Sequence, residues 1–147
     1  MSQAPARQAR SPTDESIAST RRRILVVDDN RDSADTLAKL LALSGHETQT
    51  AYDGIEAVAA VEKFLPDLVL LDIGLPKLDG YEACRRIRRM PGGERIVIIA
   101  MTGWGQEQDR RKSKEAGFNG HLVKPLEYGA LMKLLAECGA SSQPPDF

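Results

Sequence analysis

Four short apolar runs, separated by helix-like segments, most constrain how this chain can fold. They lie at residues 24–27, 68–71, 96–101 and 121–123 and are rich in Val, Ile and Leu. Runs of this length and composition predict strands of a parallel sheet that is buried on both faces. Residues 47–51 predict a fifth, shorter strand. The alternation of strand and helix signals therefore predicts an α/β fold with a five-stranded parallel sheet.

The segments between the runs carry helical signals. Apolar residues recur there at helical spacing, and Asp79 has the position of an N-cap. The residues that share these helix faces are Leu37, Leu40, Leu41, Ser44, Val58, Val61, Leu65, Cys84, Ile87, Leu131, Leu134, Leu135 and Cys138. The segment at about 106–116 is largely charged and has a narrow apolar face. We expect a marginally stable helix there, which could shift at low cost.

The composition excludes several classes of protein. The chain has 147 residues, 41% of them hydrophobic, and a formal net charge of −1, which argues against direct binding to nucleic acid. No apolar stretch approaches the ~20 residues that cross a bilayer. The two cysteines, Cys84 and Cys138, predict neither a disulfide framework nor a metal site. We expect a cytoplasmic protein that does not insert into membranes.

The same composition divides the chain into three parts. Residues 1–21 are rich in Ser, Ala, Gln, Arg and Pro, which predicts a disordered N-terminal extension. Residues 22–138 predict one folded domain, and residues 139–147 a short flexible tail.

Within the domain, one expected helix carries a basic run, which predicts a solvated face around Ile87. The residues of this run are Arg85, Arg86, Arg88 and Arg89.

Each of the four longer runs leads directly into polar side chains. In chain order these are Asp28 with Asp29, then Asp72, Thr102 and Lys124. The carboxyl ends of parallel strands lie at one edge of the sheet, and α/β proteins bind ligands in the crevice outside that edge. The sequence therefore predicts three carboxylates, a hydroxyl and an ammonium around one cleft.

This set of groups favours a particular chemistry. Two carboxylates ~4 Å apart repel each other by roughly 4 kcal/mol at an effective dielectric constant near 20. Mg²⁺ relieves such repulsion, because it prefers oxygen ligands and binds carboxylates together with phosphate oxygens. A carboxylate can also accept a phosphoryl group as a nucleophile, and the hydroxyl and ammonium can neutralise the phosphoryl oxygens. The residues alone thus predict a site for a hard metal ion and a phosphoryl group.

These residues also carry a family resemblance, because five fragments look like the motif set of response-regulator receiver domains. The fragments are Val26-Val27-Asp28-Asp29-Asn30, Leu71-Asp72-Ile73-Gly74-Leu75-Pro76, Asp79-Gly80-Tyr81, Met101-Thr102-Gly103 and Lys124-Pro125. They occur in the order and spacing of that family, over residues 22 to about 138. The resemblance implies a doubly wound, flavodoxin-like (βα)5 fold with strand order 2-1-3-4-5.

The resemblance also implies roles for the acidic residues. Asp72 would be the phosphoacceptor for a sensor histidine kinase or a histidine phosphotransfer protein. Asp29, Asp72 and the backbone carbonyl of Gly74 would bind Mg²⁺ directly, and Asp28 would bind it through water. Thr102 would hydrogen-bond the phosphoryl group and Lys124 would form a salt bridge to it. The Lys124-Pro125 bond would be cis, as is typical of the family.

Two departures from the family pattern concern three positions. His121 stands where receiver domains commonly carry the Tyr or Phe of a rotamer switch, so the inward swing of an aromatic ring is in doubt and a pH-sensitive coupling could replace it. Gly74 and Trp104 stand two residues after Asp72 and Thr102, where the family tunes the lifetime of the phosphoryl group. Neither offers a carboxylate or amide to position an attacking water, so we expect slow autodephosphorylation.

The resemblance implies a signalling module with no substrate of its own, rather than an enzyme. Its output would pass to an unidentified partner protein through the face formed by the helix at about 106–116, the strand at 121–123 and the last helix, and this face could also form a dimer. One alternative is a receiver-fold scaffold that acts without phosphorylation. Another is an aspartyl-nucleophile phosphohydrolase of the haloacid dehalogenase type, but Asp28-Asp29-Asn30 lacks the second Asp of the Asp-x-Asp motif.

Overall fold

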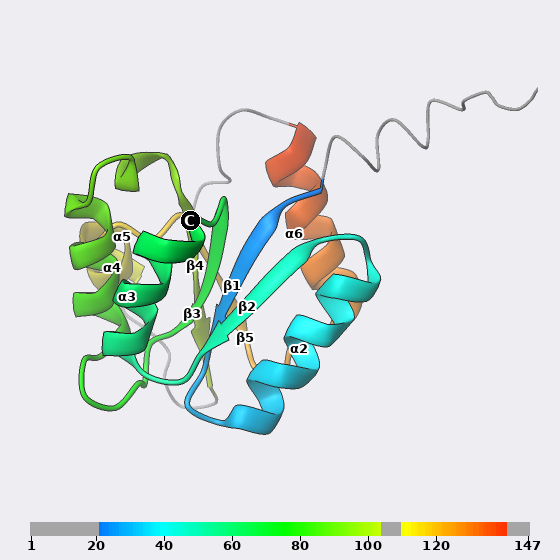
Figure 1. Cartoon of the computed structure of the whole chain (residues 1–147), viewed down its shortest axis with the longest axis horizontal. Helices are drawn as coiled ribbons and strands as arrows, with labels where there is room; N and C mark the ends of the chain where they lie inside the picture. The colour runs from blue at the N-terminus through cyan, green and yellow to red at the C-terminus, as the bar shows by residue number, and fades with distance from the viewer. Residues whose placement is uncertain (1–20, 104–109, 141–147) are drawn as a thin grey trace, which may run out of the picture.

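The computed structural model describes residues 21–103 and 110–140, with the side chains of residues 110 and 138–140 left out (Figure 1). In chain order the elements are β1 (Arg23–Val27), α2 (Arg31–Leu43), β2 (Glu47–Ala51), α3 (Gly54–Phe64), β3 (Leu68–Asp72), α4 (Gly80–Arg89), the 3₁₀ helix η2 (Gly93–Arg95), β4 (Val97–Thr102), α5 (Arg110–Ala116), β5 (Gly120–Val123) and α6 (Tyr128–Ala140). The predicted N-terminal extension, most of the C-terminal tail and Trp104 lie outside the described residues. No helix within the described ranges is long and apolar enough to cross a membrane.

The five strands form one parallel sheet with the order β2-β1-β3-β4-β5, which confirms the predicted flavodoxin-like arrangement. Helices α2 and α6 cover one face of the sheet, and α3, α4 and α5 cover the other (Figure 1). The register pairs Val27 with Leu71, Asp72 with Met101, and Thr102 with Val123. The strands therefore end close to one another along the same edge.

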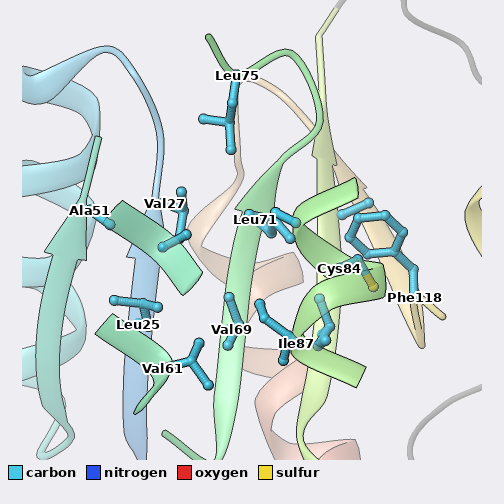
Figure 2. Close-up of a cluster of buried hydrophobic side chains, with 14 of the residues drawn as sticks. Leu25, Val27, Ala51, Val61, Val69, Leu71, Leu75, Cys84, Ile87 and Phe118 are labelled. Atoms are coloured by element: carbon cyan, nitrogen blue, oxygen red, sulfur yellow. The ribbon is translucent and has the colours of Figure 1, made fainter. Parts of the chain in front are cut away.

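Alternating strand residues supply the two halves of the core, because successive side chains of a strand point to opposite faces. Leu25, Val27, Val69 and Leu71 pack toward α3 and α4, as Figure 2 shows. Their neighbours Ile24, Val26, Leu68 and Leu70 pack toward α2 and α6. Every residue of β3 is buried, as predicted for a strand in the middle of a parallel sheet.

Two predicted core positions are wrong. Leu65 is 69% exposed, because α3 ends at Phe64 and Leu65 adopts a left-handed C-cap conformation with φ of 53°. Phe64 is buried in its place. On α2 the buried residues are Ala34, Ala38 and Leu41, and Leu40 is 41% exposed at the rim of that face.

Other predictions about side chains are confirmed. Asp79 caps α4, since its side chain accepts a hydrogen bond from the backbone N–H of Glu82. Cys84 is a free cysteine in the core, and burial raises the pKa of its thiol to about 12. The bond between Lys124 and Pro125 is cis.

The basic run on α4 is only partly the solvated face that we predicted. Arg85 and Arg86 form ion pairs with Glu82 at 3.1 and 3.3 Å, and Arg89 is exposed. Arg88 differs, because its guanidinium is turned inward and its burial lowers its pKa. The run is therefore three surface cations and one internal cation.

Arg88 joins α4 to two other segments through every N–H of its guanidinium. Its Nε and Nη2 donate to the carbonyl oxygen of Gly117 at 2.9 and 2.7 Å, and Nη2 also donates to Asn119 Oδ1 at 2.7 Å. Its Nη1 donates to the carbonyl oxygens of Gly93 and Ile96. One side chain thus ties the end of α4 to η2 and to the turn between α5 and β5.

The environment of His46 predicts that the stability of the protein depends on pH. Its Nδ1 accepts a hydrogen bond from the backbone N–H of Arg22 at 3.0 Å, so the folded state needs the neutral ring. Burial lowers the pKa of His46, and the positive charges of Arg22 and Arg21 lower it further. Because the unfolded chain then takes up the proton first, we expect the free energy of unfolding to decrease as the pH falls below about 6.5.

Urea unfolding of wild type and His46→Asn between pH 7.5 and 5 measures this effect. The asparagine offers an acceptor that does not titrate, so its curve should be flatter than that of the wild type. Equal slopes for the two proteins would contradict a contribution from His46.

Candidate functional site

The structure gathers the predicted polar residues at the carboxyl edge of the sheet. Asp28 follows β1, Asp72 ends β3, and one carboxylate oxygen from each of Asp28, Asp29 and Asp72 lies within 4.8 Å of the other two. Thr102 ends β4, and the residue after β5 is Lys124. The backbone joins these last two strands at the same level, since the N–H of Lys124 donates to the carbonyl oxygen of Thr102 at 2.7 Å.

The ammonium of Lys124 lies between two of the carboxylates. Its Nζ is 2.7 Å from Asp28 Oδ2 and 3.0 Å from Asp72 Oδ2. Burial lowers the pKa of Lys124, but the hydrogen bonds to Asp28 and Asp72 outweigh it, so the net shift is upward. The lysine therefore stays charged and neutralises part of the acidic cluster.

Asp72 is the buried centre of this cluster. Its Oδ1 accepts a hydrogen bond from the backbone N–H of Gly74 at 2.9 Å, and its Oδ2 faces Lys124. Burial raises the pKa of Asp72 and the charge of Asp28 adds to the rise, although the bonds from Gly74 and Lys124 oppose it. Ionised Asp72 is thus less favourable here than in water, as expected for a buried carboxylate beside a second carboxylate.

Backbone contacts hold the other groups of the site. Asp28 Oδ1 accepts from the N–H of Asn30 at 3.0 Å, whereas Asp29 is exposed. Thr102 is buried, and its hydroxyl donates to the carbonyl oxygen of Leu122 at 3.5 Å. His121 is half-buried on β5.

The loop after Asp72 returns tightly to its own strand. The N–H of Gly80 donates to the carbonyl oxygen of Ile73 at 3.1 Å, and a Cβ at Gly80 would lie only 2.5 Å from the carbonyl oxygen of Asp72. Lys77, in the middle of this loop, has φ of 67° and lies 3.4 Å from Asp53 Oδ2. This ion pair was not predicted from the sequence. The only local signal was Asp53 followed by Gly54 after β2, which indicates a helix cap and not a partner for Lys77.

The donor set fits a magnesium ion. Three carboxylates carry three negative charges, and the one ammonium that contacts Asp28 and Asp72 offsets only one of them. A divalent cation with oxygen ligands would balance the remainder. Asp28, Asp29 and Asp72 are therefore the residues that could hold it.

The charge imbalance predicts the effect of Asp72→Asn on stability. Because the raised pKa means that ionised Asp72 disfavours the folded state, the free energy of unfolding of the metal-free variant at pH 7 should exceed that of the wild type. Added Mg²⁺ should stabilise the wild type and have little effect on the variant. Thermal unfolding with EDTA or Mg²⁺ tests this, with the exposed Glu62→Gln as control; a less stable metal-free Asp72→Asn would contradict it.

Comparison with known proteins assigns the family. The family model for the response regulator receiver domain matches residues 24–136. An uncharacterised 14.6 kDa protein of Leptolyngbya boryana is 38% identical over 78% of this chain and 87% of its own length. The response regulator MprA of Mycobacterium avium is 36% identical, but this chain spans only 50% of its length.

Solved structures agree with this match. The receiver domain of the sensor histidine kinase PA1611 from Pseudomonas aeruginosa, with a magnesium ion coordinated in its active-site cleft, is 36% identical with a TM-score of 0.74, over 82% of this chain and 99% of that one. The receiver domain of Ssk1 from Saccharomyces cerevisiae, crystallised with the histidine phosphotransfer protein Ypd1, is 28% identical with a TM-score of 0.74, over 86% of this chain and 94% of that one. With its fold, the order of its strands and the match over residues 24–136, the chain belongs to the response regulator receiver domain family.

Proposed function

We propose that this chain is the phosphoacceptor of a cytoplasmic two-component or phosphorelay system, phosphorylated on Asp72 in a Mg²⁺-dependent reaction. The observation that carries the proposal is the position of Lys124, whose ammonium contacts Asp28 and Asp72, two members of the three-carboxylate cluster. A buried carboxylate beside a fixed cation, with excess negative charge around it, suits a nucleophile that works with a divalent metal.

In the proposed reaction, an oxygen of Asp72 attacks the phosphorus of a phosphohistidine on a sensor kinase or phosphotransfer protein. The P–N bond of the donor breaks as the P–O bond to Asp72 forms, and the electron pair returns to the imidazole. Mg²⁺, held by Asp29, Asp72 and the carbonyl of Gly74 with Asp28 through water, would neutralise charge on the phosphoryl oxygens. Lys124 would exchange its contact with Asp72 for one with the phosphoryl group.

The phosphodonor has an apolar surface beside the site on which to dock. A groove of about 630 Å³ lies between α2 and the segment 124–126 that follows β5, and Asp28 and Lys124 form its wall on the side of the site. Its other walls include Leu37, Leu40 and Leu126. We propose that a helix of the donor packs there and brings its phosphohistidine to Asp72, which would also explain why Leu40 is left at the surface.

After phosphorylation, Thr102 would hydrogen-bond the new phosphoryl group and transmit its presence toward α5. The output surface would be the face of α5, β5 and α6, read by a partner protein or used for dimerisation. His121 lies on β5 within that face, where it would take the part of the usual aromatic switch. The chain would assist both its own phosphorylation and its own dephosphorylation, which we expect to be slow. It would not act on a separate substrate.

Incubation of the chain with Mg²⁺ and acetyl phosphate, read by intact mass, tests the proposal. The wild type should gain one phosphoryl group, and should gain none when EDTA replaces Mg²⁺. Asp72→Asn should gain none, whereas the control Asp67→Asn, which changes an exposed carboxylate at the far end of β3, should behave as the wild type. Equal incorporation by wild type and Asp72→Asn, or none by the wild type, would overturn it.

A further inference from the structure

The turn between β2 and α3 packs directly against the loop that follows Asp72. A Cβ at Gly54 would lie 1.9 Å from the carbonyl oxygen of Leu78, so the loop backbone rests on the first residue of α3 at a distance that only glycine permits. The two segments are far apart in the sequence. The contact therefore holds the loop after β3 against a segment other than β3 itself.

The carboxylate before this glycine makes a second contact with the loop. Asp53 is buried, and its Oδ1 caps α3 by accepting from the N–H of Glu56 at 2.8 Å. Its Oδ2 lies 3.4 Å from Lys77 Nζ. The hydrogen bond from Glu56 lowers the pKa of Asp53, which outweighs the opposing effect of burial, and Lys77 lowers it further, so the carboxylate is ionised and available to the lysine.

Lys77 reaches this carboxylate from an unusual backbone conformation. Its φ of 67° lies in the left-handed region, where a side chain is strained and glycine is not. A lysine at this position destabilises the backbone slightly relative to glycine, but it places an ammonium beside the carboxylate of Asp53. The pair is only partly shielded, since the side chain of Lys77 is 68% exposed.

The same turn also contacts the other half of the acidic cluster. The carbonyl oxygen of Ala51, at the end of β2, accepts a hydrogen bond from the N–H of Asp28 at 3.1 Å. The short segment from Ala51 to Gly54 thus joins the end of β1, which carries Asp28 and Asp29, to the loop after Asp72. Its contacts add a second connection between these two segments, whose strands β1 and β3 already pair directly.

From these contacts we infer that Lys77 is a positioning residue for the divalent-cation site, acting through its ion pair with Asp53. The pair holds the loop after Asp72 against the β2–α3 turn, so that Asp72 and the backbone of Gly74 stay within reach of a cation bound by Asp29. This inference rests on the proposed Mg²⁺ site. Lys77 would lie outside the acidic cluster and would not be a ligand; it would affect the metal only by holding the loop in place.

The sign of one mutational effect separates positioning from plain electrostatics. Removing a positive charge near a cation site should tighten Mg²⁺ binding if charge alone matters. If Lys77 positions the loop, Lys77→Met should instead weaken Mg²⁺ binding about three- to tenfold. This is at or below the lower end of the roughly 10–100-fold losses seen for residues that orient metal ligands. Lys77→Arg, which keeps the cation, should bind Mg²⁺ as the wild type does.

Isothermal titration of the full chain with Mg²⁺ measures these affinities. Lys63→Met is the matched control, because Lys63 is an exposed lysine near the other end of α3, and its affinity should equal that of the wild type. Hydrogen exchange provides a second readout without metal, in which the backbone amides of residues 74, 75 and 77–79 should exchange faster in Lys77→Met than in Lys63→Met.

Each outcome decides the inference. Unchanged or tighter Mg²⁺ binding by Lys77→Met, with unchanged exchange in the loop, overturns the role of Lys77 and leaves the metal site intact. A wild-type chain that takes up no Mg²⁺ overturns the proposed site together with this inference. Weaker binding by Lys77→Met that Lys77→Arg restores supports it.

Discussion

Arg88→Met should lower the free energy of unfolding by about 3 kcal/mol or more, one of the two largest effects that we expect. The substitution keeps much of the apolar stem but removes all five donors of the guanidinium, which bond to Gly93, Ile96, Gly117 and Asn119. Hydrogen bonds to charged groups contribute about 1.5–3 kcal/mol each, and acceptors left without donors add a penalty. Relief of the burial of a cation offsets only part of this loss.

Urea denaturation of Arg88→Met and Arg89→Met tests the prediction. Arg89 is the exposed neighbour on the same turn of α4, so its replacement should change the free energy of unfolding by less than about 0.5 kcal/mol. Arg88→Lys should fall between the two, because an ammonium has three donors and lacks the planar fork. Similar midpoints for Arg88→Met and Arg89→Met would show that the network contributes little.

Gly80→Ala should cost about 2–3 kcal/mol of stability. The new Cβ would lie 2.5 Å from both the carbonyl oxygen of Asp72 and the Cα of Ile73, which are backbone atoms that no change of rotamer can move away. The loop or the start of α4 would have to shift, and the carboxylate of Asp72 would move with it. We therefore expect weaker Mg²⁺ binding as well as a lower melting temperature.

Gly129→Ala provides a control of opposite sign. Gly129 lies in α6, and a Cβ there would meet no atom within 4 Å. Alanine favours a helix over glycine by up to about 1 kcal/mol, so this variant should be more stable than the wild type. If calorimetry gave both variants the same melting temperature, the steric argument for Gly80 would be wrong.

The strands and the acidic cluster could be predicted from the sequence because both depend on local patterns. A run such as Leu68–Leu71 is apolar at every position, and in a parallel sheet the residue that ends it must lie beside the ends of its neighbours. Asp28, Asp72 and Lys124 therefore came together as predicted. The roles of Thr102, His121 and Gly74 stay predictions, since they concern a bound phosphoryl group or metal.

What the sequence could not predict depends on contacts between distant segments. Leu40 and Leu65 follow the apolar spacing, but the rotation of α2 on the sheet and the early end of α3 leave both at the surface. Arg88 looks like its surface neighbours until the turn at Gly117, 29 residues later, folds onto it. Lys77 and Asp53 likewise meet only once α3 and the loop after β3 are in place.

The Arg88 network also bears on how α5 could respond to events at the site. Gly117 and Asn119, just after α5, accept hydrogen bonds from Arg88 of α4, so we expect the C-terminal end of α5 to move less than its N-terminal end. A tilt of α5 would pivot there, and the displacement of its atoms would grow along the helix toward Arg110. A partner protein that distinguishes two states of this chain would therefore discriminate best by binding the first turn of α5, where the displacement would be largest.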